Sequence, residues 1–142
     1  MCTKNNYFKF LLVSILLLFS KFSYAQTEAD FIGDWKIIKV DMLPSAGQEE
    51  KQMFQKVRSI FSKSTFHFKS NNLFSFDSPD IDLSIKDGIW NFDAKNRYIT
   101  ISERMSKGTR DLLMGIYVKE TIGGFLFYME ETSVILMVTR KN

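Results

Sequence analysis

The chain is poor in the residues that build covalent cross-links and transition-metal sites. It contains one cysteine, Cys2, and one histidine, His67, among 142 residues. A single thiol excludes an internal disulfide, and too few thiolate and imidazole ligands remain for a zinc or copper site. The sequence therefore predicts no metal and no cofactor.

Catalytic motifs are lacking as well. The sequence has no nucleophile elbow, no phosphate-binding loop, no metal-binding motif and no cluster of residues around its one histidine. His67 stands between Phe66 and Phe68, so alternation predicts that it faces solvent from a strand. We expect a protein that is not an enzyme.

A group of acidic residues falls in one predicted loop. Its spacing lacks the pattern of an EF-hand calcium loop, and Pro79 constrains the same segment. We interpret the group as a solvated acidic rim. Its members are Asp77, Asp80, Asp82 and Asp87.

The first 25 residues have the pattern of a signal peptide. Lys4 and Lys9 precede an apolar run over residues 10–19, and Ser23 and Ala25 are small residues that suit signal peptidase. The run is shorter than the roughly 20 apolar residues of a membrane span. We therefore expect cleavage after Ala25, no membrane anchor afterwards, and a periplasmic or secreted protein.

The remaining chain, residues 26–142, has balanced charge. Lys4, Lys9 and Lys21 all belong to the predicted leader, so its removal lowers the formal net charge from +3 to zero. A nucleic-acid partner is not expected, because binding phosphates requires a basic surface. The length suits a single domain.

Alternating apolar and polar residues dominate this domain, which is the period of strands that bury one face. Eight such antiparallel strands in succession can close into an up-and-down barrel, which leaves no exposed edge. The sequence thus predicts an all-β, eight-stranded antiparallel barrel, with a β-sandwich as the alternative. The predicted strands cover residues 35–42, 65–69, 73–77, 88–92, 97–102, 112–119, 125–130 and 133–140.

One helix is predicted between the first two strands, over residues 45–61. Ser45 and Gln48 have the spacing of a capping box. We expect this helix to form a lid over the barrel end that carries the longer connections. Its apolar face consists of Met53, Phe54, Val57, Ile60 and Phe61, which recur at helical spacing.

The first strand opens with Gly33, Asp34 and Trp35, and the last strand ends at Arg140. In these features the chain resembles the lipocalin-like β-barrels, the calycin group that includes lipocalins and fatty-acid-binding proteins. The resemblance implies that Trp35 closes the base of the barrel and that Arg140 packs across it. It does not extend to the R-x-Y pair with which fatty-acid-binding proteins hold a carboxylate, so it does not imply a fatty acid.

Two functions are open to a barrel of this size, because its interior either holds one small ligand or is filled by its own side chains. We expect an exported protein that binds a small apolar ligand. The alternative is a filled barrel that serves as a protein–protein interaction or self-association module. The residues expected to point inward and line a ligand site are Phe66, Phe68, Phe74, Phe76, Trp90, Phe92, Ile99, Ile101, Phe125 and Phe127.

The last three predicted strands are apolar on both faces. If Met114, Ile116, Phe127, Leu136 and Val138 face inward, the residues that face outward are Leu113, Tyr117, Leu126, Tyr128, Ile135 and Met137. Soluble monomers rarely expose such a patch. We expect the helix over residues 45–61 to cover it, or else a protein partner or a second copy of the chain.

Overall fold

The computed structural model describes residues 26–104 and 111–142. The predicted signal peptide lies outside the described residues. The strands are β1 (Gly33–Met42), β2 (Thr65–Phe68), β3 (Leu73–Asp77), β4 (Ile85–Asp93), β5 (Tyr98–Glu103), β6 (Leu112–Thr121), β7 (Gly124–Met129) and β8 (Val134–Arg140).

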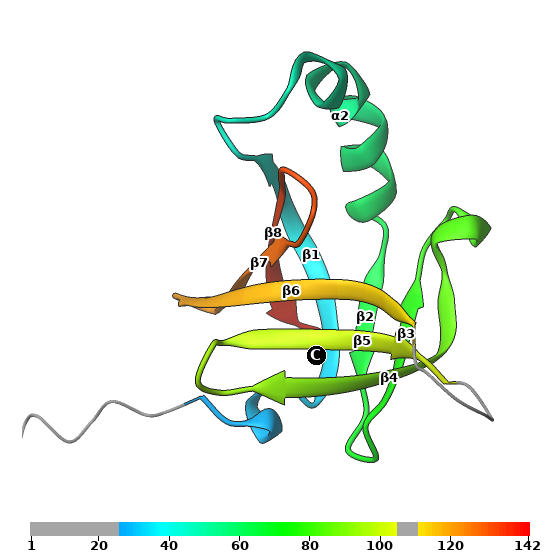
Figure 1. Ribbon diagram of the computed structural model, residues 1–142, viewed down its shortest axis with the longest axis vertical. Coiled ribbons are helices and arrows are strands. Elements are labelled where there is room, and N and C mark those ends of the chain that lie inside the picture. Colours follow the sequence, from blue (N-terminus) through cyan, green and yellow to red (C-terminus); the bar gives the residue numbers. More distant parts are fainter. Residues whose placement is uncertain (1–25, 105–110) are drawn as a thin grey trace, which may run out of the picture.

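These strands form one closed barrel. Each pairs antiparallel with its neighbours in sequence, and β8 pairs antiparallel with β1 to complete the ring (Figure 1). Closure gives every strand two hydrogen-bonded neighbours and removes the free edges that an open sheet would expose. The predicted all-β, eight-stranded antiparallel barrel is confirmed, and so is the single helix between the first two strands.

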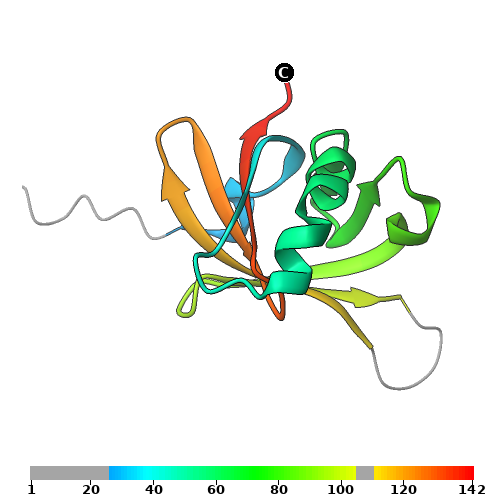
Figure 2. The same ribbon diagram turned by 90° about the horizontal axis from the view of Figure 1, so that it is seen from above.

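Helices mark the two ends of the barrel. The α-helix α2 (Gln48–Phe61) stands at one end, the mouth, and the short 3-10 helix η1 (Glu28–Asp30) lies at the opposite end, the base (Figure 1). A second 3-10 turn, η2 (Ile81–Leu83), interrupts the connection from β3 to β4. Figure 2, viewed from above, has α2 in front of the strands and η1 beyond them.

The helix begins three residues later than predicted, and the capping box of Ser45 and Gln48 is wrong. Gly47 is the N-cap, and its backbone N–H donates to Glu50 Oε2 at 2.8 Å. The same carboxylate oxygen accepts from Ser133 Oγ at 3.0 Å. Glu50 therefore determines where α2 starts and ties that end of the helix to the connection before β8.

The fourth strand also differs from its predicted start. It begins at Ile85 rather than at residue 88, because Ile85 pairs with Phe76 across an irregularity in the β3–β4 register. Strand β1 carries a bulge between Ile37 and Lys39, which leaves Ile38 55% exposed on the outside.

The hydrophobic core occupies the barrel interior, where inward-facing side chains of all eight strands meet. Ala46 and Ser64 are also buried, near the mouth. The largest side chains that are less than 2% exposed are Trp90, Phe31, Phe66, Phe68, Phe74, Phe76, Phe127, Ile99, Ile101, Ile116, Leu136 and Val138.

Candidate functional site

The base of the barrel is closed where the first strand meets the last. The β1–β8 register pairs Trp35 with Arg140, and the guanidinium carbon of Arg140 lies 4.8 Å from the centre of the Trp35 ring. The indole is only 3% exposed. A cation over an indole face stabilises by about 0.5–2 kcal/mol, depending on how far it is desolvated.

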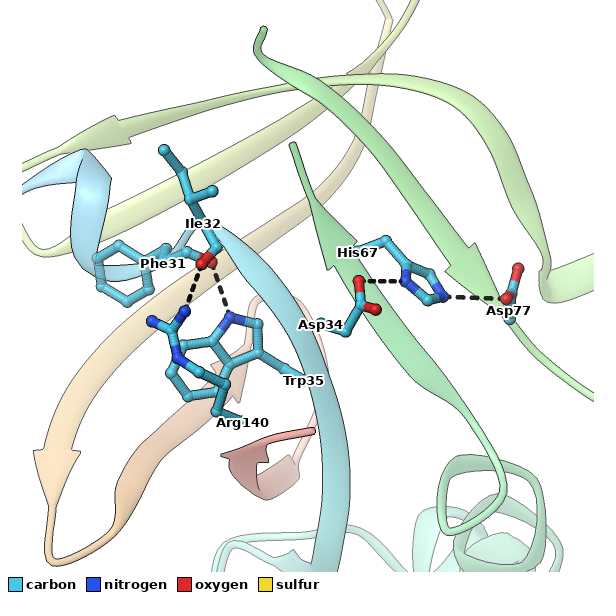
Figure 3. A network of polar contacts seen from close by, with 7 residues as sticks. All are labelled: Phe31, Ile32, Asp34, Trp35, His67, Asp77 and Arg140. Atoms are coloured by element: carbon cyan, nitrogen blue, oxygen red, sulfur yellow. Dashed lines mark hydrogen bonds and ion pairs between the residues drawn. The ribbon is translucent and has the colours of Figure 1, made fainter. Parts of the chain in front are cut away.

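The same two side chains hold the segment that leads into β1 (Figure 3). Trp35 Nε1 donates to the carbonyl oxygen of Phe31 at 2.7 Å. The Arg140 guanidinium donates to the carbonyl oxygens of Ile32 and Asp30, at 2.7 and 3.0 Å. These bonds hold the chain across the base of the barrel and satisfy backbone acceptors at the end of η1.

Phe31 plugs this end of the barrel. It is 0% exposed, and its ring centre lies 4.6 Å from that of Phe92 and 4.8 Å from that of Phe125. Sequence reasoning missed Phe31 as a core residue because it precedes the first strand and belongs to no alternating pattern.

Gly33 is required by its surroundings. Its φ is +133°, and a Cβ there would lie 2.9 Å from Nη1 of Arg140. The φ favours glycine because L-residues rarely adopt it, and a side chain here would also force the Arg140 guanidinium to shift. The first and last members of the Gly33–Trp35 motif thus have separate physical roles at the base.

A second set of bonds joins η1 to the β2–β3 turn. Asn72, in the left-handed conformation with φ of 62°, donates through Nδ2 to Glu28 Oε1 at 2.6 Å and to the Trp90 carbonyl oxygen at 3.2 Å. Trp90 Nε1 donates to the Lys69 carbonyl oxygen at 3.0 Å. The bond from Asn72 to Glu28 thus fastens η1 to the β2–β3 turn.

The ten side chains predicted to line a ligand site all lie in the barrel interior or at its base. Nine are buried, and Phe92 is half-buried. Their rings pack on one another, since the centre of Phe66 lies 4.8 Å from that of Phe76 and 5.5 Å from that of Phe127. Phe68 meets Trp90 edge-on at 5.0 Å. Several of the aromatic residues expected to surround a ligand therefore pack on one another inside the barrel.

A groove of about 620 Å³ lies outside the base, beside Arg140. Two of its polar side chains already have partners: Gln26 Nε2 donates to Glu120 Oε2 at 3.4 Å, and Arg140 is held by the carbonyl oxygens described above. Among the described residues, Gln26 Oε1 is buried in this groove without a hydrogen-bond partner. The groove mixes charges of both signs, which does not suit an apolar ligand. It is lined by Gln26, Thr27, Asp30, Trp35, Glu120, Thr121, Gly123, Gly124, Phe125 and Arg140.

His67 lies on the outer face of β2, as alternation predicted, but it is not freely solvent-facing. Its side chain is 20% exposed. Nδ1 lies 2.6 Å from Asp34 Oδ1, and Nε2 lies 2.9 Å from Asp77 Oδ2 (Figure 3). Since carboxylates only accept, both contacts are hydrogen bonds when the ring carries a hydrogen on each nitrogen. The three side chains tie β1, β2 and β3 together.

The predicted acidic rim is not one cluster. Asp77 contacts His67, whereas Asp80 Oδ1 accepts the backbone N–H of Asp82 at 3.1 Å and caps η2. Over residues 26–104 and 111–142, no group of three or more His, Cys, Asp or Glu side chains has an arrangement that could hold a metal ion.

The predicted lid residues lie where α2 meets the mouth. Phe54 and Phe61 pack against the core, and the Phe61 ring centre lies 5.9 Å from that of Phe76. Val57 and Ile60 are half-buried. Met53 is 56% exposed, so its assignment to the packed face of the helix is wrong. The last two helical turns therefore make most of the contact with the barrel.

The outward apolar residues of the last strands remain partly exposed. Tyr117 and Leu113 are 49% and 44% exposed, and Leu126, Tyr128, Ile135 and Met137 are intermediate. The helix expected to cover them packs instead on β1 and the mouth. We call the surface formed by Tyr117, Lys119, Leu126, Tyr128, Ile135, Met137, Lys39 and Asp41 the outer array.

Beside the outer array, Tyr98 reaches across Gly115 to donate its hydroxyl hydrogen to the Glu130 carboxylate. A Cβ at Gly115 would overlap both side chains, so only glycine leaves room for this bond. The hydrogen bond to Glu130, followed by burial, raises the pKa of Tyr98 to about 12. Sequence reasoning did not single out this pair, which the β5–β6–β7 register brings together.

Within the described ranges, no helix is both long enough and apolar enough to cross a membrane. The sequence matches no family profile and no curated protein. Among solved structures, the chain is similar to a DUF4847 family protein from Bacteroides vulgatus ATCC 8482, with 12% sequence identity and a TM-score of 0.45. That similarity covers 77% of this chain and 92% of the other.

Proposed function

We propose that the protein is a filled-barrel interaction module that binds a polypeptide through the outer array, and that it does not carry a small molecule in its lumen. One observation carries the proposal. The aromatic side chains expected to surround a ligand pack on one another inside the barrel, while an apolar surface stays partly exposed outside. Exposed apolar patches of this kind are typical of protein-binding sites.

The competing function is binding of a small apolar ligand in the barrel. Such a ligand would have to displace rings such as Phe66, Phe68 and Phe127, which are at most 1% exposed. Removing one buried phenylalanine side chain costs a protein about 3–5 kcal/mol. A ligand would therefore have to compensate for the loss of core contacts, whereas a partner on the outer array would displace only water.

We further propose that the module is exported and lipocalin-like. The predicted signal peptide with cleavage after Ala25 supports export to the periplasm or the outside. The conformation of Gly33 and the contact of Trp35 with Arg140 support the lipocalin-like relationship. Catalysis and nucleic-acid binding are not part of this proposal.

Site-specific photo-crosslinking in the source organism tests the proposal. A photoreactive residue at Tyr128, in the outer array, should give one discrete adduct whose polypeptide partner is identified by mass spectrometry. The same residue at Asn91, which is exposed on the outside of β4, is the matched control and should give none. The absence of an adduct from Tyr128, together with a stoichiometric small molecule retained in native mass spectra, would favour the carrier instead.

A further inference from the structure

We propose that the polypeptide bound by the outer array is a second copy of this chain, in a twofold-symmetric dimer. The inference rests on the proposed function and names the partner at the same site. It follows from how the strand register arranges charged and apolar side chains across β6, β7, β8 and β1.

The outer array consists of two parallel rows that run across the four strands. The register pairs Tyr117 with Tyr128, Tyr128 with Ile135 and Ile135 with Asp41, which makes the first row. The second row, made in the same way, is Lys119, Leu126, Met137 and Lys39. The two middle positions of each row are apolar or aromatic. The charged residues Asp41, Lys119 and Lys39 lie at the row ends, and the fourth end is Tyr117.

Consider a twofold axis in the plane of the interface, placed between the two rows and parallel to them. Rotation about this axis brings the first row of one copy against the second row of the other copy. Tyr128 then faces Leu126, Ile135 faces Met137, and Asp41 faces Lys39 of the second copy. Apolar groups meet apolar groups, and Asp41 and Lys39 each meet the opposite charge. A contact between identical patches requires this self-complementarity.

The charges select this orientation. A twofold axis parallel to the strands would also place apolar groups on apolar groups, but it would bring Lys119 against Lys39 of the second copy. Like charges that face each other in an interface repel and disfavour that orientation. With the axis between the rows, Lys119 instead faces the ring of Tyr117, where a cation is attracted.

The charged ends are accessible for such contacts. Lys39 and Asp41 form an ion pair of 2.8 Å within one chain, and their side chains are 60% and 51% exposed. In the dimer, two such pairs meet to form a network of four alternating charges. An exposed isolated pair contributes little to stability, whereas several charges arranged in a network contribute more.

Sedimentation velocity of residues 26–142 tests the dimer. The wild type should shift from monomer to dimer as its concentration rises. Lys39→Glu places an acid opposite Asp41 of the second copy, and Asp41→Lys places a base opposite Lys39. Each variant alone should weaken self-association by about tenfold or more, because like charges then face each other.

Mixing the two variants in equal amounts gives the decisive readout. In a mixed pair every acid faces a base, so association should return toward the wild-type level. A change confined to one chain could not produce this rescue. Lys56→Glu, an equal change of charge on the exposed side of α2, is the control and should associate like the wild type.

Three results would overturn the dimer: a wild type that stays monomeric up to its solubility limit, single variants that associate as well as the wild type, or a mixture without rescue. If any of these occurs while crosslinking from Tyr128 identifies a different polypeptide, the proposed function stands and only the second copy is wrong. If crosslinking from Tyr128 gives no adduct either, both proposals fail.

Discussion

At the base of the barrel, Arg140 contacts one ring and two backbone carbonyl groups at once. Its guanidinium lies over Trp35 and donates to the carbonyl oxygens of Ile32 and Asp30. The planar group, with several donors in one plane, suits this combination, whereas the ammonium of lysine would provide a single charged point. Closure of the base therefore depends on the shape of this side chain as well as on its charge.

We predict that Arg140→Lys lowers the free energy of unfolding by about 1–3 kcal/mol, since at least one charged hydrogen bond and the stacking are lost. Urea unfolding measures the change. Lys141→Ala, which removes the neighbouring charge, is the control and should change the free energy by less than about 0.5 kcal/mol, as is usual for surface residues. Equal effects of the two variants would contradict the assigned role of Arg140.

Tyr98 makes a contribution to the free energy of unfolding that is lost at alkaline pH. Its pKa is raised from 10.0 to about 12 in the folded state by the bond to Glu130. The folded state therefore holds this proton more tightly than the unfolded state. The contribution is complete below the unfolded value of 10.0 and is lost as the pH rises toward about 12.

We predict that the difference in unfolding free energy between the wild type and Tyr98→Phe is constant up to about pH 9 and shrinks above pH 10. Denaturant titrations at several pH values measure it, and Tyr128→Phe serves as the control because that tyrosine has no such bond. A difference that does not vary with pH would show that the bond to Glu130 is not what stabilises the fold.

At the scale of elements, the start of α2 depends on a contact that is distant in sequence. Glu50 accepts hydrogen bonds from the Gly47 backbone N–H and from Ser133. These bonds, with the one from Gly47 the largest cause, lower the pKa of Glu50 below its ordinary value of 4.5. The stabilisation is therefore present above about pH 4.5 and is lost as the pH falls through the lower, folded-state pKa.

We predict that Glu50→Gln destabilises the protein at neutral pH and that its difference from the wild type disappears in acid, when the wild-type carboxylate is protonated. Unfolding followed by circular dichroism at both pH values measures this. Glu49→Gln, which removes the adjacent exposed carboxylate, should have a smaller effect at neutral pH. A constant Glu50→Gln effect across this range would contradict the capping role.

The elements differ in how far the sequence predicts them. Alternation around Phe66, Phe68, Phe74 and Phe76 predicts strands because burial on one side imposes a period of two. The predicted start of α2 is wrong because Ser45 is of a residue type that commonly caps helices. The actual start is determined by the Glu50 carboxylate, which bonds to Gly47 and also to Ser133, 83 residues further along the chain. Local pattern cannot include such a partner.

At the candidate sites, too, contacts between residues distant in sequence are harder to predict than local pattern. The contact between Trp35 and Arg140 could be predicted, because the resemblance and barrel closure both bring the chain ends together. The partners of His67 could not, since Asp34 and Asp77 are 33 and 10 residues away and become neighbours only through the β1–β2–β3 register. Whether inward-facing rings leave a cavity depends on their packing, which alternation does not describe.

For the whole molecule, the central feature is a closed barrel with closely packed aromatic side chains in its interior. Closure removes the strand edges, and η1 with Phe31 covers the base while α2 packs at the mouth. Phe127 lies in the middle of this core, 5.5 Å from the ring of Phe66 and 6.3 Å from that of Phe68. In the proposed function, recognition therefore falls to the outer surface of this barrel.

We predict that Phe127→Ala lowers the free energy of unfolding by about 3–5 kcal/mol, since it removes a fully buried ring and leaves a cavity among the others. Thermal and denaturant unfolding measure the loss. Tyr117→Ala, on the outside of β6 and 49% exposed, is the control and should cost much less. A Phe127→Ala loss as small as that of the control would indicate that the interior is loosely filled.

Crystals pressurised with xenon test the filled barrel most directly, because xenon enters dry apolar cavities in proteins. The wild type should contain no xenon inside the barrel, and Phe127→Ala should contain it at the position of the missing ring. Xenon or a bound organic molecule within the wild-type lumen would show that the barrel is hollow and would make a carrier the better function.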